Sequence, residues 1–282
     1  MQTFIPLPVA NWLIKQGISR VQLDAGVSRE AVTADGVPCE WIIPQNNPTD
    51  QVLLYLHGGG FVFRLTPPHL KMGAYLAQKM GTRILMVDYR TAPTDPFPAA
   101  LNDCVTVYLW LLKQGILAQN IVVAGDSAGG NLTITTLMKL RDNGDLLPAA
   151  AACLSPVTDL TPREKLREGF KDPLIPPKAA KFYNQSYSGN NDAHNPLISP
   201  VFGNLRGLPP LLVHAGEDEF LRDDAMRIAR LAKSAGVDVR LEIYPRMWHV
   251  WQLNLSLPQA IQSLDEIAHF FKTHLASEPS EN

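Results

Sequence analysis

Short apolar runs recur along the chain, and segments with helical spacing lie between them. The runs are continuously apolar rather than alternating, which is typical of strands buried on both faces of a parallel sheet. The expected strands are Gln51–Leu56, Thr82–Val87, Asn120–Ala124, Ala149–Leu154, Leu211–Ala215 and Val237–Ile243. The expected helices are His69–Met80, Ala99–Gln114, Gly129–Asn143, Asp223–Ala235 and Gln259–His274. This alternation predicts an α/β fold with a mostly parallel sheet and helices on both faces.

Two regions break the alternation, residues 1–45 and residues 157–208. The first contains a possible short amphipathic helix, Val9–Gln16, and the second is rich in proline, aromatic and polar residues. A loop as long as the second is usually functional in a compact fold. We therefore expect 1–45 and 157–208 to form a helical cap over the carboxyl edge of the sheet, and 46–156 with 209–282 to form the main α/β domain.

The composition fits a globular α/β protein and excludes some function classes. The 282 residues are 46% hydrophobic and 18% charged, enough apolar side chain for a large core. Lys and Arg number 25 and Asp and Glu number 27, so nothing suggests the basic surface that a nucleic-acid partner requires. Cys39, Cys104 and Cys153 are too dispersed for a disulfide framework or a metal site.

We expect a cytoplasmic protein without stable membrane insertion. The scattered cysteines suit a reducing compartment, and no apolar run approaches the length of a membrane span. The first residues carry no basic leader, and Pro6 and Pro8 interrupt their apolar run, which is unlike a secretory signal.

Gly125-Asp126-Ser127-Ala128-Gly129 follows an expected strand and opens an expected helix. Glycines on both sides of a serine allow the sharp strand-to-helix turn that exposes a nucleophilic hydroxyl. A structural glycine turn is the alternative, but the strand and helix context favours Ser127 as a nucleophile. The backbone N–H of Ala128 would then face the developing negative charge.

His57-Gly58-Gly59-Gly60-Phe61 follows an earlier expected strand. Three consecutive glycines imply that bare backbone must approach something closely. A phosphate-binding loop is disfavoured because no Gly-Lys-Ser/Thr follows and no Gly-x-Gly-x-x-Gly opens a helix. A plain loop remains the other alternative, whereas an oxyanion hole would complement Ala128.

A serine nucleophile needs a base and a carboxylate that orients the base. In α/β proteins whose nucleophilic serine lies at a strand-to-helix turn, both residues follow the serine in the sequence. His249 is the favoured base because it lies in a loop just after the strand Val237–Ile243, whereas the other downstream histidines suit core, cap or helix positions. Asp218 is the favoured acid because it follows the preceding strand. The neighbouring Glu217 and Glu219 could substitute in principle, although adjacent side chains point in different directions.

Together these motifs resemble the hormone-sensitive-lipase-like (bacterial family IV) carboxylesterases of the α/β-hydrolase fold. The match covers HGGGF at 57–61, DYRTAP at 88–93, FPAALND at 97–103, GDSAGGNL at 125–132, the acidic region at 217–224 and the loop at 249. The resemblance implies a triad of Ser127, Asp218 and His249 and an oxyanion hole of Gly59, Gly60 and Ala128. It also implies a structural role for His57 and a cap like the one expected above.

The expected function is hydrolysis of short- to medium-chain carboxylic esters through an acyl-enzyme, without a metal or other cofactor. The expected partner is a small ester, and a homodimer is possible because edge-strand dimers are common in the resembled family. Aromatic side chains are candidates for the pocket, namely Phe61, Phe182, Tyr183, Trp248 and Trp251. The alternatives are an amidase, peptidase or thioesterase with the same triad, or a non-catalytic receptor, which the presence of His249 disfavours.

Overall fold

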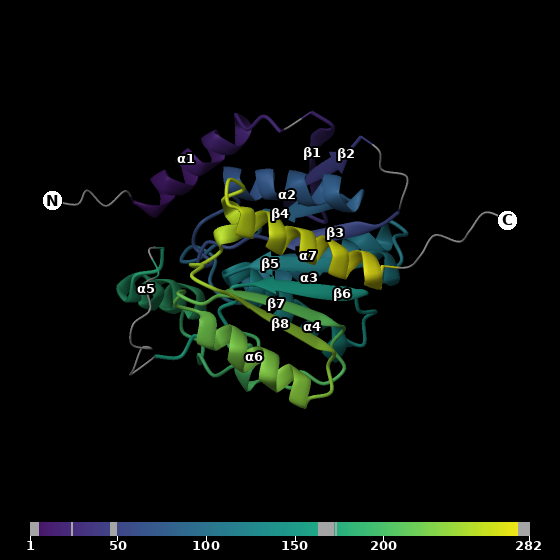
Figure 1. The fold of residues 1–282 in the computed structure, drawn as a ribbon. Coiled ribbons are helices and arrows are strands. Elements are labelled where there is room, and N and C mark those ends of the chain that lie inside the picture. Colours follow the sequence, from purple (N-terminus) through teal and green to yellow (C-terminus); the bar gives the residue numbers. More distant parts are fainter. Residues whose placement is uncertain (1–5, 24, 46–49, 163–171, 173, 276–282) are drawn as a thin grey trace.

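The protein folds around one eight-stranded sheet (Figure 1). The computed structural model describes residues 6–23, 25–45, 50–162, 172 and 174–275. The strands are β1 (Val27–Ala34), β2 (Val37–Pro44), β3 (Val52–Leu56), β4 (Arg83–Val87), β5 (Ile121–Asp126), β6 (Ala150–Leu154), β7 (Leu211–Gly216) and β8 (Val239–Tyr244). The helices are α1 (Leu7–Ser19), α2 (Pro67–Met80), α3 (Ala99–Lys113), α4 (Ala128–Asn143), α5 (Pro177–Ser188), α6 (Arg222–Ser234) and α7 (Pro258–His274).

The strand order in the sheet is β1-β2-β4-β3-β5-β6-β7-β8. Strands β3 to β8 run parallel to one another, whereas β2 is antiparallel to both β1 and β4. The carboxyl ends of the parallel strands therefore meet at one edge, where an open α/β sheet binds its ligands.

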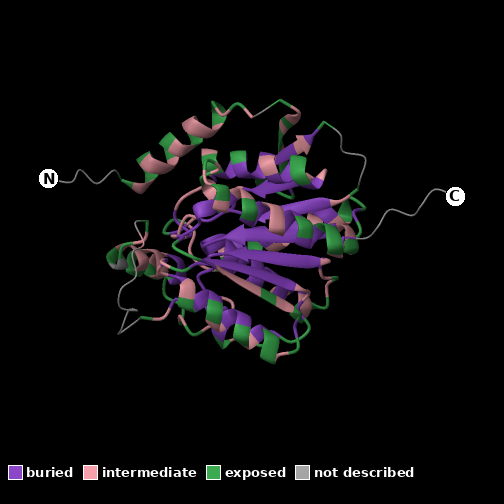
Figure 2. Ribbon diagram, viewed as in Figure 1, coloured by how far each residue is buried: buried purple, intermediate pink, exposed green. Residues whose placement is uncertain are grey.

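Helices cover both faces of the sheet, so the central strands β3 to β7 are buried on both sides (Figure 2). Leu53 and Tyr55 pack in the cluster that contains α2 and α7, and Leu54 and Leu56 pack on the opposite face with α3 and α4. Helix α6 packs on the same side as α4, over β7 and β8. This two-sided burial explains why the strand sequences are continuously apolar.

The α/β-hydrolase fold expected from the sequence is confirmed. Each of the six expected strands and five expected helices is present, and no end differs by more than two residues. None of the described helices is both long and apolar enough to cross a lipid bilayer.

The structure differs from the expectation in the first 45 residues. Residues 27–44 form the β1–β2 hairpin at the edge of the sheet, so they extend the sheet and do not belong to a cap. Asp35 and Gly36 form the turn of the hairpin with φ angles of 45° and 94°. An Asp-Gly pair between two alternating segments is a strong hairpin signal. Strands β1 and β2 could therefore have been predicted from this pair.

Helices α1 and α5 lie toward the carboxyl edge of the sheet (Figure 1). The amphipathic helix expected at Val9–Gln16 is confirmed as α1, and the Asn11 side-chain amide donates a 2.9 Å hydrogen bond to the Val62 carbonyl. Helix α5 comes from the region 157–208, and its last turn receives a backbone hydrogen bond from Phe97 N–H to the Tyr187 carbonyl. The expected cap residues 163–171 and 173 lie outside the described residues.

Candidate active site

Ser127 occupies a strained turn between β5 and α4. Its φ and ψ are 52° and −115°, an unusual conformation for a residue with a side chain. A Cβ atom at Gly125 would collide with the Gly129 carbonyl, and one at Gly129 would collide with the Leu56 carbonyl. Both glycines are therefore required for the turn that directs Ser127 toward a cavity.

Backbone N–H groups of the glycine loop lie beside this serine. Leu56 at the end of β3 pairs with Gly125 on β5, so the loop that follows β3 lies next to the Ser127 turn. Gly59 and Gly60 have φ angles of 124° and 60°. Among the described residues, no recorded hydrogen bond uses the N–H of Gly59 or Gly60, and Ala128 begins a helix, where N–H groups lack intrahelical partners. These three groups remain able to bind an oxyanion.

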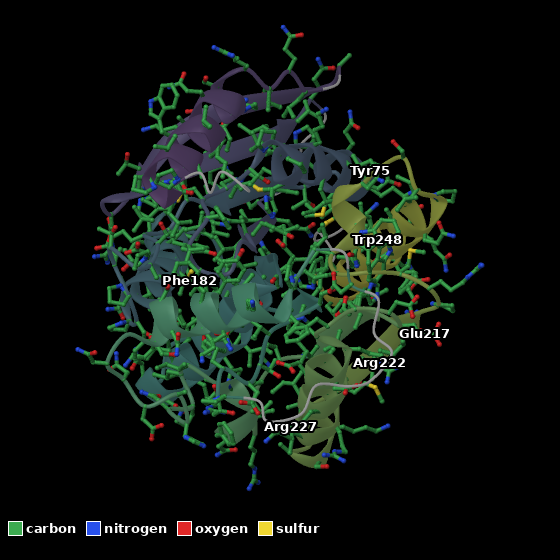
Figure 3. All side chains as sticks on the ribbon, turned by 90° about the vertical axis from the view of Figure 1, so that its left-hand side faces the viewer. Tyr75, Phe182, Glu217, Arg222, Arg227 and Trp248 are labelled. Carbon is green, nitrogen blue, oxygen red and sulfur yellow. The ribbon has the colours of Figure 1, made fainter. Side chains whose placement is uncertain are left out.

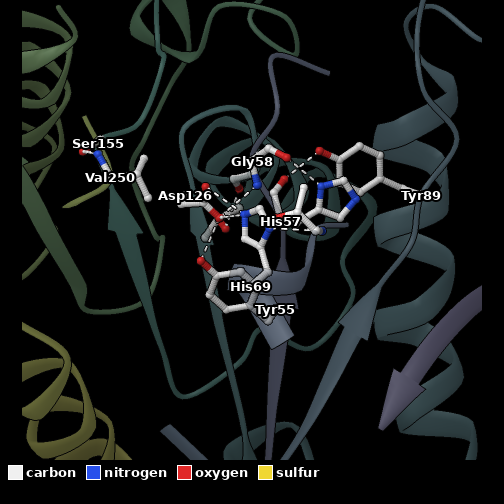
Figure 4. Close-up of polar contacts among 11 residues, drawn as sticks. Tyr55, His57, Gly58, His69, Tyr89, Asp126, Ser155 and Val250 are labelled. Atoms are coloured by element: carbon white, nitrogen blue, oxygen red, sulfur yellow. Dashed lines mark hydrogen bonds and ion pairs between the residues drawn. The ribbon is translucent and has the colours of Figure 1, made fainter. Parts of the chain in front are cut away.

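Asp126, which precedes the serine, holds the glycine loop in place (Figure 4). Its Oδ1 accepts hydrogen bonds from the Tyr55 hydroxyl at 2.8 Å and from Gly58 N–H at 2.9 Å. His69 Nε2 lies 3.3 Å from Oδ2, and the Thr66 hydroxyl lies 2.6 Å from His69 Nδ1. Burial opposes ionisation of Asp126, but His69, Tyr55 and Gly58 outweigh it and hold the pKa of this carboxyl below its usual range.

His57 lies against the other side of the glycine loop. Its ring stacks on Tyr89 with centroids 4.1 Å apart, and its Nδ1 lies 2.7 Å from the Gly58 carbonyl oxygen. The Tyr89 hydroxyl donates a 2.7 Å hydrogen bond to the His57 carbonyl. Burial lowers the pKa of His57 to about 4, so the ring is neutral and its Nδ1–H donates to Gly58. These contacts fit an ordering role rather than a catalytic one.

His249 lies in the loop after β8 and is buried. Its Nδ1 lies 3.9 Å from Oε2 of Glu219. Burial lowers the pKa of His249 to about 4, and the negative charges of Asp172 and Asp126 oppose this shift. A neutral imidazole at this position can accept a proton, as a general base must.

The structure does not bring Asp218 to His249. No hydrogen bond or ion pair recorded among the described residues joins the Asp218 carboxylate to the histidine, and Asp218 N–H donates to the Met247 carbonyl at 3.0 Å. The next residue, Glu219, faces Nδ1 instead. Three acidic residues are consecutive here, and adjacent side chains point in different directions. The position facing the histidine therefore depends on the turn after β7, which the sequence pattern does not specify.

Glu219 is fully buried, which is unusual for a carboxylate. Its Oε2 accepts a 2.6 Å hydrogen bond from the Ser155 hydroxyl. Burial raises the pKa of Glu219 to about 8, although the hydrogen bonds from Ser155 and from the Gly216 backbone oppose the shift. Sequence reasoning named Glu219 only as an alternative and did not identify Ser155.

A cavity of about 30 Å³ opens onto Ser127 and Gly60. Two of the expected pocket residues, Phe61 and Tyr183, line it. Phe182 is exposed on α5, and Trp248 lies in the loop after β8 (Figure 3). Trp251 is fully buried in a separate cluster with Tyr244. The lining also includes residues that the sequence pattern did not identify, namely Val157, Ile175, Ala180, Asn184, Phe220 and Leu221.

This fold with a serine at a strained strand–helix turn defines a class, the hydrolases of the α/β-hydrolase fold. Residues 53–253 match the protein family described as "alpha/beta hydrolase fold". An acetyl-hydrolase of Streptomyces hygroscopicus is 37% identical over 86% of this chain and 82% of its own. An esterase of Acinetobacter venetianus is 36% identical over 83% of this chain and 78% of its own.

Solved structures agree with these relatives. The crystal structure of an esterase from the bacterial hormone-sensitive lipase family is 37% identical, covers 98% of this chain and 94% of its own, and gives a TM-score of 0.89. A hormone-sensitive lipase from a metagenome library is 35% identical over the same shares, with a TM-score of 0.92. The chain belongs to the hormone-sensitive-lipase-like (bacterial family IV) esterases of the α/β-hydrolase family, and it is a carboxylic ester hydrolase.

Proposed function

We propose that this esterase hydrolyses short- to medium-chain carboxylic esters through an acyl-enzyme on Ser127. The observation that supports this most directly is the position of Ser127 at the strained turn, beside the N–H groups of Gly59, Gly60 and Ala128. His249 is the proposed general base. Glu219 replaces Asp218 as the proposed acid, because its carboxylate lies nearest to the histidine Nδ1.

The proposed reaction has two half-reactions. His249 Nε2 accepts the proton of Ser127 Oγ as the oxygen attacks the ester carbonyl carbon, and the three N–H groups bind the resulting oxyanion. The C–O bond to the alcohol then breaks, and His249 donates the proton to the departing alcohol. Water attacks the acyl-enzyme by the same route and releases the acid. Every step uses groups of this chain, the substrate and water, so the proposal includes no cofactor.

Glu219 holds the imidazole during these steps. Its charge stabilises the imidazolium that forms when His249 accepts a proton, and it fixes the tautomer with a hydrogen on Nδ1. The 3.9 Å separation is longer than a hydrogen bond. Catalytic hydrogen bonds are often long in a free enzyme and shorten when charge develops.

The size of the cavity favours the short end of this substrate range. About 30 Å³ accommodates roughly two water-sized groups, and the walls next to Ser127 are mostly apolar. The Streptomyces relative is named an acetyl-hydrolase. We therefore place acetyl and propionyl esters among the preferred substrates of this chain.

The test compares Ser127→Ala with the unchanged protein on p-nitrophenyl esters from acetyl to palmitoyl. We expect Ser127→Ala to lose about a millionfold in kcat while its circular dichroism and unfolding curve stay unchanged. An organophosphate should label Ser127 in the unchanged protein only. Substantial turnover by Ser127→Ala, or failure of the label, would refute the acyl-enzyme proposal. Matched thioester and anilide substrates would show whether esters are preferred.

A further inference from the structure

We propose that Ser155 is a positioning residue that couples the acid of the triad to the loop that carries the base. The proposal rests on the function proposed above, in which Glu219 orients His249. Ser155 follows β6 and lies outside every motif by which the sequence identifies the site. It is not among the residues that line the cavity at Ser127.

The Ser155 hydroxyl contacts both halves of the pair. It donates a 2.6 Å hydrogen bond to Glu219 Oε2, the same oxygen that faces His249. It also accepts a 3.2 Å hydrogen bond from the N–H of Val250, the residue after the histidine (Figure 4). One hydroxyl therefore links the carboxylate itself to the backbone that holds the base, beside the hydrogen bond from Asp218 N–H to the Met247 carbonyl that joins the same two loops.

The hydrogen bonds run in one direction, from Val250 N–H to the Ser155 hydroxyl and from there to Glu219. A hydroxyl that accepts one hydrogen bond is polarised as a donor, so the two bonds strengthen each other in a buried site. A donor to a carboxylate also favours its charged form. Ser155 thus stabilises the ionised Glu219 that the imidazolium of His249 requires.

The backbone at both ends of this link is strained. Ser155 has a φ of 49°, and Val250 has a φ of 48°, a conformation that β-branched residues rarely adopt. Such conformations persist where the surroundings over-determine them, often at functional sites. Ser155 is fully buried, and its N–H donates a 2.7 Å hydrogen bond to the His214 carbonyl, which anchors it to β7.

The first test is Ser155→Ala, which removes the hydroxyl and keeps the Cβ. A hydrogen bond to a charged group corresponds to a rate effect of about 10- to 100-fold. We expect kcat for p-nitrophenyl acetate to fall by that factor, with KM changed less than about threefold. Ser155→Gly also lacks the hydroxyl and adopts a φ of 49° without strain, so it replaces Ser155→Ala if that variant does not fold.

The pH profile separates positioning from stability. Asp172 and Asp224 raise the pKa of Glu219, and Asp172 and Asp126 oppose the lowered pKa of His249. These charges remain in the variant, so loss of the Ser155 donor alone should move the rise of kcat/KM with pH toward the alkaline side. Ser155→Thr keeps a hydroxyl and should recover most of the lost kcat.

Ser263→Ala is the matched control. Ser263 is equally buried and its hydroxyl contacts His214 and Gln252, outside the proposed triad. It should leave kcat and the pH profile unchanged. If Glu219→Gln retains activity, the assignment of the acid fails and the role of Ser155 fails with it. If Glu219→Gln is inactive but Ser155→Ala and Ser155→Gly keep normal kcat and pH profiles, only the Ser155 proposal is overturned.

Discussion

The two halves of the site are held by different means. On the nucleophile side, Asp126 receives hydrogen bonds from Tyr55 and Gly58 and contacts His69, so several partners fix the serine turn and the glycine loop. On the acid–base side, Glu219 and His249 lie 3.9 Å apart. Their two loops are joined by hydrogen bonds from Asp218 N–H to the Met247 carbonyl and from Arg246 N–H to Glu217 Oε2. The Ser155 hydroxyl links the Glu219 carboxylate itself to Val250 N–H.

The difference also appears in the direction of the pKa shifts. Asp126 has enough donors to overcome its burial, and its pKa lies below the usual range. The donors to Glu219 do not overcome its burial, which raises its pKa to about 8. The Asp126 carboxylate is therefore held in its charged form by its donors, whereas burial favours the neutral form of Glu219. Variants on the two sides should consequently fail in different ways.

Among the variants that compare the two halves of the site, replacement of Glu219 should lower kcat the most. Glu219→Gln keeps the size of the side chain but removes the charge and presents a donor to Nδ1, which favours the wrong tautomer of His249. We expect kcat to fall by about 10,000-fold. The matched variant is Asp218→Asn, which should change kcat by less than about threefold. Steady-state kinetics with p-nitrophenyl acetate measures both, and the reverse ranking would restore Asp218 as the acid.

The pH profile sharpens the same comparison. Burial lowers the pKa of His249 to about 4 and raises that of Glu219 to about 8, so between these values the pair holds one proton. Loss of that proton leaves the carboxylate charged and Nε2 free. In the unchanged protein, kcat/KM should therefore rise with pH through the upper value. Glu219→Gln removes the group that gives this rise, and a profile still rising near pH 8 would contradict the assignment.

Replacing Asp126 tests the other half. Asp126→Asn leaves one side-chain oxygen for the three donors Tyr55, Gly58 and His69. Its amide group also places a hydrogen against one of these donors. We expect a loss of about 2–4 kcal/mol in the free energy of unfolding. We also expect a fall of about 10- to 100-fold in kcat, because a displaced glycine loop weakens the oxyanion donors. Urea unfolding and kinetics well below the unfolding midpoint separate the two effects.

Asp103→Asn is the control for this variant. Asp103 is a buried carboxylate that accepts hydrogen bonds from the Arg90 backbone and guanidinium, and among the described residues no recorded hydrogen bond joins it to the glycine loop. Asp103→Asn should lower the free energy of unfolding but leave kcat unchanged. Equal effects of both variants on kcat would mean that Asp126 acts through general stability alone.

The two halves also differ in how far the sequence predicts them. The nucleophile side follows from local rules, since the glycines around Ser127 and in the loop at 57–61 are needed where the backbone turns or approaches closely. The position of the acid depends on a turn after β7 in which three acidic residues are consecutive, so a shift of one residue exchanges Asp218 for Glu219. Ser155 and His69 act across the fold, through neighbours that no local pattern reveals.

The same distinction between local and long-range contacts explains which parts of the fold were predicted. Continuously apolar strands and amphipathic helices are visible in the sequence and were predicted within two residues at each end. The β1–β2 hairpin was missed because its residues alternate in burial and stand at the edge of the sheet. The pocket was predicted least well, since Phe220 and Leu221 reach it only through the turn that also carries Glu219.

The smallest expected effect concerns helix α5, which packs on the glycine loop. A Cβ at Gly60 would lie 2.7 Å from the Tyr183 ring, so this ring packs directly on the glycine loop and limits the cavity. Tyr183→Ala should admit longer acyl chains and raise the ratio of kcat/KM for hexanoyl over acetyl esters about tenfold. The adjacent Phe182 is exposed and does not line the cavity, so Phe182→Ala should leave this ratio unchanged. An equal shift in both variants would show that loosening of α5, rather than the volume of the Tyr183 ring, sets the acyl preference.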